Sequence, residues 1–83
     1  MEKCLYYRIN ADYMRTRGNG LADLTKKWLN EQGIDVIVDD FILGEDANII
    51  IDFSFDLKVK REKVILLTEQ LFERFKIEFE LDN

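Results

Sequence analysis

Carboxylates are the side chains of this chain with the clearest chemical potential, and they are most crowded in one segment. Residues 34–59 hold seven acidic residues and one basic residue, whereas residues 1–33 carry a net charge of +2 and residues 60–83 a net charge of −1. Crowded carboxylates can coordinate a hard cation or face a basic protein surface. They also repel nucleic acid phosphates, so we expect no direct binding of DNA or RNA.

The composition argues against most catalytic chemistry. The chain contains no histidine, which removes the commonest general base and transition-metal ligand. Cys4 is the only cysteine, so neither an internal disulfide nor a cysteine zinc site can form. Asp39 and Asp52 are the best candidates for a cation site, but no calcium-loop spacing surrounds them. We therefore predict a protein that is not an enzyme and that holds neither a metal ion nor a cofactor.

The acidic segment contains a run of alternating residues that is typical of a strand with one buried face. Between residues 47 and 59 every odd position is apolar, and most even positions are polar. Asp52 and Asp56 fall on the polar side of this run. The negative charge is therefore expected where a sheet meets solvent.

The strand expected before it, over residues 34–43, has a less regular pattern. Ile34, Val36 and Val38 follow one parity, but the apolar positions then switch to Phe41 and Leu43. We predict a β-bulge at Asp39-Asp40 that restores the phase, because one extra residue would return Phe41 to the buried face. A tight turn at residues 44–46 is expected to join the two strands as a hairpin.

The remaining segments complete a familiar order of elements. Strands are predicted near residues 4–9 and 77–81, and helices over residues 20–32 and 61–74, with Gly33 in place to end the first helix. The order β-α-β-β-α-β predicts a ferredoxin-like α+β fold. Residues 1–83 would form one domain, a four-stranded antiparallel sheet with both helices on one face.

The uncovered face of this sheet is where we expect function. RNA-recognition modules of this topology stack bases on open-face aromatic residues, but only Tyr6 is available here as a platform. Acids spaced along a sheet can instead mimic phosphates, with Ile37, Ile50 and Tyr6 exposed as contact anchors. The predicted partner-binding residues are Tyr6, Asp35, Ile37, Asp39, Asp40, Glu45, Asp46, Ile50, Asp52 and Asp56.

These residues predict a small acidic protein-binding module whose partner is a basic protein surface. A nucleic-acid-binding enzyme is the partner class of first interest, because its surface is built to attract phosphates. Small acidic inhibitors from phages and mobile elements, including anti-CRISPR proteins, are similar in size and charge. The exposed Ile37 and Ile50 also leave open a homodimer through the same face.

A second hypothesis places the site in the connection of residues 10–20. Arg15 and Arg17 precede Gly18 and Gly20 just before a predicted helix start, where positive charge and backbone N–H groups can hold a phosphate or carboxylate. The chain would then be a small-molecule or anion-binding regulatory domain that acts as a homodimer.

The sequence predicts a cytoplasmic protein without membrane association. It starts without a basic-then-apolar signal pattern. Its longest apolar runs, residues 49–51 and 64–67, are too short to span a bilayer.

Overall fold

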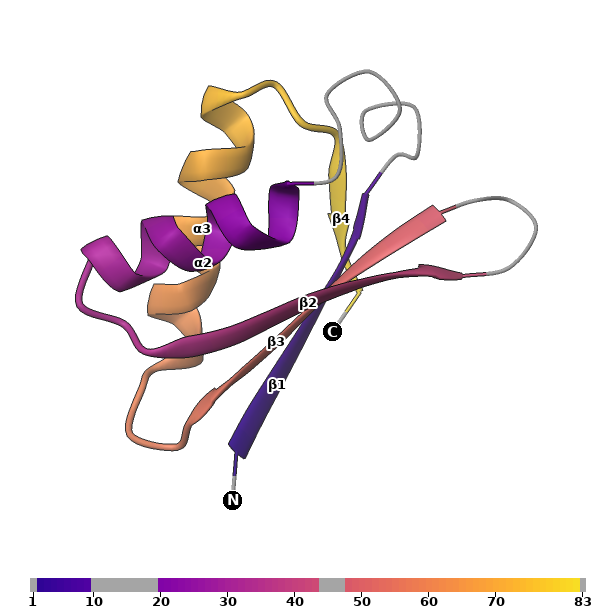
Figure 1. Ribbon diagram of the computed structural model, residues 1–83. Coiled ribbons are helices and arrows are strands. Elements are labelled where there is room, and N and C mark those ends of the chain that lie inside the picture. The colour runs from indigo at the N-terminus through magenta and orange to yellow at the C-terminus, as the bar shows by residue number, and fades with distance from the viewer. Residues whose placement is uncertain (1, 10–19, 44–47, 83) are drawn as a thin grey trace.

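The computed structural model describes residues 2–9, 20–43 and 48–82. Its elements are, in chain order, β1 (Glu2–Ile9), α2 (Leu21–Glu31), β2 (Val36–Leu43), β3 (Asn48–Asp56), α3 (Arg61–Arg74) and β4 (Phe79–Leu81). The strands form one antiparallel sheet in the order β2-β3-β1-β4. Both helices lie on the same face of this sheet (Figure 1). The predicted ferredoxin-like fold is confirmed.

β2 and β3 pair in one unbroken register over the whole length of β2. Val36 lies opposite Phe55 at one end, and Leu43 lies opposite Asn48 at the other. No extra residue interrupts the pairing between these ends, so the β-bulge predicted at Asp39-Asp40 is wrong.

The regular register sends the two central acids of β2 to opposite sides of the sheet. Asp39 lies opposite Asp52 on the open face, and Asp40 lies opposite the fully buried Ile51 on the helix side. Residues opposite each other in an antiparallel pair share a face, so Phe41 joins Asp39 on the open face. The bulge was predicted on the assumption that Phe41 is buried, whereas its side chain is 45% exposed.

The hydrophobic core fills the space between the sheet and the two helices. Tyr7 of β1 lies at its centre, fully buried, with its ring in edge-on contact with Phe53, Phe72 and Phe79. Its hydroxyl donates a hydrogen bond of 2.9 Å to Oε2 of Glu69. Burial, and then this hydrogen bond, raise the pKa of Tyr7, so its one polar group remains protonated and satisfied inside an apolar layer.

Each helix ends in the same hydrogen-bonded motif. After α2, Gly33 has a φ of 83°. The backbone N–H of Gly33 donates a hydrogen bond to the Asn30 carbonyl, and the N–H of Ile34 donates one to the Leu29 carbonyl. These are the two bonds of a Schellman motif, and Gly33 ends the helix as predicted. α3 closes in the same way, with a non-glycine residue, Lys76, at a φ of 56°.

The buried side of α2 differs from the predicted one. The spacing of Leu21, Leu24, Trp28 and Leu29 in the sequence predicts that these residues share one buried helical face, but Leu24 is 37% exposed, while Thr25 is fully buried. The Thr25 hydroxyl donates a hydrogen bond of 2.7 Å to the Leu21 carbonyl, one turn earlier. That bond satisfies the hydroxyl within the helix, so Thr25 can replace an apolar residue at the core.

Candidate functional site

The open face of the sheet is organised in rows that cross the strands. The pairing places Ile37, Ser54 and Cys4 in one row, Asp39, Asp52 and Tyr6 in the next, and Phe41, Ile50 and Arg8 in the third, from β2 through β3 to β1. Directly opposed side chains on one face lie within about 5.5 Å of each other at Cβ, so each row is a set of neighbours. The row of Asp39, Asp52 and Tyr6 is acidic and lies between two rows that carry apolar side chains on β2.

The acidic row holds negative charge that no ion pair among the described residues neutralises. Asp39 and Asp52 stand directly opposite each other. Within the described part of the chain, neither takes part in an ion pair, and the Oδ1 atom of Asp52 is buried without a hydrogen-bond partner. Burial, and then the charge of Asp39, raise the pKa of Asp52. The pKa of Tyr6 is also raised, first by Asp52 and then by Cys4. A cation brought to this row would relieve both effects.

Arg8 is a cation of this face, and it forms its ion pair on the β4 side of β1, whereas Asp39 and Asp52 lie on the β3 side. Its Nη2 atom lies 3.5 Å from Oδ2 of Asp82, beyond the end of β4. Both side chains of this pair are more than 40% exposed, so the ion pair contributes about 0 to 1 kcal/mol at most. The Nε atom of Arg8 is buried without a partner among the described residues. Arg8 therefore leaves Asp39 and Asp52 uncompensated.

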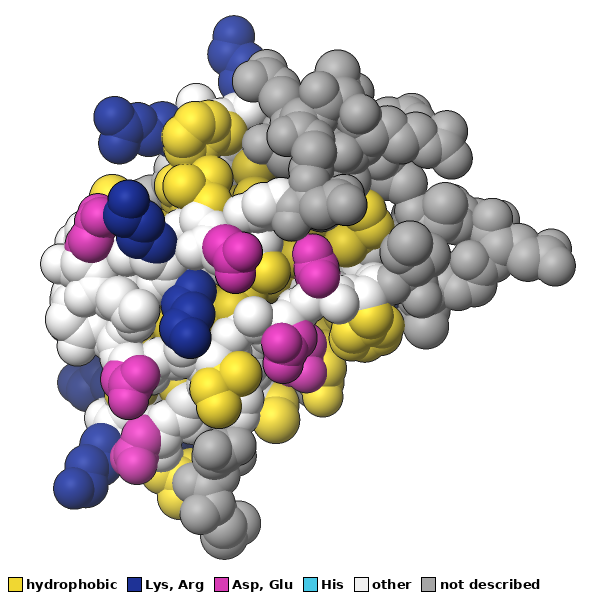
Figure 2. All heavy atoms as spheres, viewed as in Figure 1, with side chains coloured by type: hydrophobic (Ala, Val, Ile, Leu, Met, Phe, Trp, Pro, Cys, Tyr) yellow, Lys and Arg dark blue, Asp and Glu magenta, His cyan; other side chains and the backbone are white. Residues whose placement is uncertain are grey.

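Two exposed apolar side chains flank Asp39 along β2. Ile37 is 55% exposed and Phe41 is 45% exposed, and both point to the open face. Figure 2 shows hydrophobic and acidic side chains next to one another on the side along which β2 runs, whereas the basic side chains lie mainly toward the helices. The combination of apolar area with adjacent unneutralised charge is typical of a protein-binding surface.

Ile50 does not serve as the exposed anchor that the sequence predicted. It points to the open face, but it is only 4% exposed. Phe41 and Arg8 stand on either side of it in the same row, and both side chains are long enough to lie over it. Tyr6, also predicted as an anchor, is partly buried. Phe41, and not Ile50, is therefore the exposed apolar side chain of this row.

Other predicted residues lie around one end of the sheet. Asp35, Ile37 and Asp56 all line a shallow hollow of about 230 Å³. Asp56 already has a local role, because its Oδ1 atom accepts a hydrogen bond of 2.8 Å from the Lys58 backbone N–H in the turn after β3. This end of the sheet is therefore acidic, but Asp56 has a hydrogen-bond partner, whereas Asp39 and Asp52 take part in no ion pair within the part of the chain that the structure describes.

The remaining predicted residues are not part of the open face as described. Asp40 is exposed on the helix side of the sheet. Glu45, Asp46, Arg15, Arg17 and Gly18 lie outside the described residues. Gly20, the last residue of the alternative anion site, is exposed at the start of α2.

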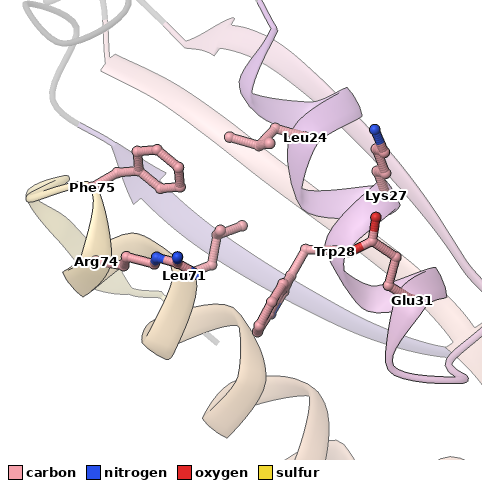
Figure 3. A pocket seen from close by; sticks show the side chains of 7 residues that line it. All are labelled: Leu24, Lys27, Trp28, Glu31, Leu71, Arg74 and Phe75. Atoms are coloured by element: carbon pink, nitrogen blue, oxygen red, sulfur yellow. The ribbon is translucent and has the colours of Figure 1, made fainter.

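A groove between the helices was not predicted. It has a volume of about 460 Å³ and is lined by Leu24, Lys27, Trp28, Glu31, Leu71, Arg74 and Phe75. Figure 3 shows the Leu24 and Trp28 side chains of α2 and the Leu71 and Phe75 side chains of α3 directed into the space between the two helices. The Trp28 indole N–H donates a hydrogen bond of 2.9 Å to the Leu67 carbonyl, which ties the helices together below the groove. A helical apolar stripe alone could not distinguish this groove from core packing.

Comparison with known proteins gives no relative for this chain. No protein-family model, curated protein sequence or solved structure matches it.

The described residues contain no group of three or more His, Cys, Asp or Glu side chains placed to hold a metal ion. Among the same residues, no helix is both long and apolar enough to cross a membrane.

Proposed function

We propose that this protein is a non-enzymatic binding module that uses the open face of its sheet to engage a basic surface of another protein. The observation that carries this proposal is the opposed pair of Asp39 and Asp52, which no cation of the described chain neutralises. Exposed Ile37 and Phe41 supply apolar contact area on either side of Asp39. A lysine or arginine of the partner would meet the carboxylates while the surrounding residues exclude water.

A nucleic-acid-binding enzyme is the partner class that best fits this surface. Such an enzyme presents lysine and arginine side chains at the spacing of phosphates, and these side chains can bind carboxylates instead of phosphates. Occupation of that basic surface would block the nucleic acid, so the module would act as an inhibitor. A phage or mobile-element protein directed against a host defence enzyme, as anti-CRISPR proteins are, would have this property.

The test compares two variants with the same net charge. One carries Asp39→Asn and Asp52→Asn on the open face, and the control carries Glu62→Gln and Glu73→Gln, both exposed on α3. Proteins captured from a lysate by the wild type are identified, and their dissociation constants are measured for all three forms at several salt concentrations. Thermal unfolding of each form confirms that it is folded.

We expect the open-face variant to bind a captured basic protein about tenfold more weakly, which corresponds to roughly 1.4 kcal/mol, and with a smaller dependence on salt. The α3 control should bind as the wild type does, and excess nucleic acid should compete with the module. An equal loss in both variants would show that net charge alone, and not the acidic row, drives binding.

A further inference from the structure

β2 lies at an edge of the sheet, and no strand of the described residues pairs with its outer side. The strand order places β2 first, and within the described chain it pairs with β3 only. The strand is eight residues long, regular in register, and free of proline. Figure 1 shows β2 along the margin of the sheet, with the helices over one face. Edge strands of this kind offer a row of backbone N–H and C=O groups to another strand.

The charges of β2 determine what kind of strand can be added. Asp39 and Asp40 occupy the middle of the strand, are both exposed, and point to opposite faces. Neither takes part in an ion pair within the described residues. The margin of the sheet therefore carries a carboxylate on each side of its edge.

These carboxylates disfavour pairing with a second copy of the chain. A two-fold symmetric pairing centred on the middle of β2 would bring the Asp39 and Asp40 side chains of both copies together. Like charges directly opposite each other in a sheet are destabilising. Charge complementarity instead favours a basic strand.

We infer that β2 accepts an extended basic segment of the partner as an additional strand. Two consecutive Lys or Arg residues of that segment would point to opposite faces, one toward Asp39 and the next toward Asp40. Apolar residues of the same segment would pack on the exposed Ile37 and Phe41. This mode of binding rests on the proposed function, because Asp39 belongs both to the open face and to the β2 edge. It specifies that the partner docks as an additional strand.

The two modes of binding differ at Asp40. A partner that lies flat on the open face contacts Asp39 and Asp52 but does not reach Asp40, which is on the helix side of the sheet. A partner that extends the sheet contacts Asp40 as closely as Asp39. Read antiparallel to β2, the matching partner pattern is apolar, basic, basic, any residue, apolar, with the first basic residue opposite Asp40.

The experiment uses a capped synthetic peptide of sequence Thr-Thr-Val-Arg-Lys-Thr-Val-Thr-Thr. Its affinity is measured for the wild type and for Asp40→Lys, and amide hydrogen exchange of β2 is followed by NMR with and without the peptide. We expect slowed exchange at alternate amides of β2 and about tenfold weaker binding to Asp40→Lys. A peptide with Glu in place of Arg should recover affinity for Asp40→Lys and lose it for the wild type. Thermal unfolding of the variant confirms its fold.

Three results would overturn edge pairing. If the peptide binds, leaves β2 exchange unchanged, and does not distinguish Asp40→Lys from the wild type, the partner lies on the open face and only the proposed function stands. If the peptide does not bind at all while the captured basic protein does, docking does not use an added strand. If the free protein sediments as a dimer with β2 amides already protected, a second copy occupies the edge.

Discussion

The two faces of the sheet are built from alternate residues of the same strands, and they differ in how the buried ionisable side chains of these strands are partnered. On the helix side, the buried Tyr7 hydroxyl has Glu69 as its partner, and the surrounding aromatic rings exclude water. On the open side, Asp52 and Arg8 each bury a polar atom that has no partner among the described residues. The first arrangement stabilises the fold, whereas the second costs stability, because a buried polar atom without a partner keeps its desolvation penalty.

The largest expected effect comes from exchanging one phenylalanine on each side of the sheet. Phe72→Ala removes a fully buried ring from the aromatic cluster and should lower the free energy of unfolding by about 3 to 5 kcal/mol. Phe41→Ala, on the open face, should lower it by only about 1 kcal/mol, because the Phe41 side chain is 45% exposed and its loss uncovers part of Ile50. Urea denaturation measures both. A large loss of stability in Phe41→Ala would mean that Phe41 supports the fold and is not a free contact surface.

A smaller effect is expected from removing one hydroxyl on each side. Tyr7→Phe deletes the hydrogen bond to Glu69 and should cost about 1 kcal/mol of stability. Tyr6→Phe alters the open face and should leave the free energy of unfolding unchanged within about 0.5 kcal/mol. Thermal and urea unfolding report the difference. Equal costs for the two changes would contradict the contrast between a satisfied and an unsatisfied face.

The smallest effect has the opposite sign and depends on pH. Asp52→Asn removes the repulsion from Asp39 and should raise the free energy of unfolding at pH 7 by about 0.5 kcal/mol. The pKa of Asp52 is raised in the folded protein, so the folded state binds this proton more tightly than the unfolded state. The wild type therefore gains stability relative to the variant as the pH falls through the folded pKa toward about 4, the ordinary value for aspartate.

Unfolding measured between pH 3 and pH 8 follows this convergence. Asp40→Asn is the matched control, because Asp40 is exposed and lies opposite Ile51 and not opposite a carboxylate. A stability difference between wild type and Asp52→Asn that persists below pH 4 would contradict the assigned repulsion.

Much of the fold could be predicted because several independent signals agree. The apolar spacing of residues 61–74 gave the bounds of α3, and Gly33 ends α2 through its positive φ. The end of α3 had no such marker, since Lys76 adopts the same backbone region without being a glycine. Local patterns predict elements well where sequence and backbone preference point the same way.

The site was predicted less well because its details depend on neighbours across the sheet. The burial of Ile50 follows from Phe41 and Arg8, which lie in other strands. The bulge was inferred from the switch of the apolar positions to Phe41 and Leu43, and an exposed apolar residue such as Phe41 breaks the pattern from which parity is read. The sequence already grouped Asp39 with Asp52 as candidates for a cation site, but only the register of β2 and β3 shows that they stand directly opposite each other.

The central position of β1 has a consequence for how the protein is made. β1 is flanked by β3 and β4, because Ile9 pairs with both Ile49 and Phe79. Both flanking strands follow β1 in the chain, so β1 leaves the ribosome before either of them. Of the strand pairs in this sheet, only β2 and β3 join consecutive strands and can form early. The nascent β1 strand remains without backbone partners until most of the chain has emerged, and translation that stalls before β4 would leave one side of it as a target for chaperones.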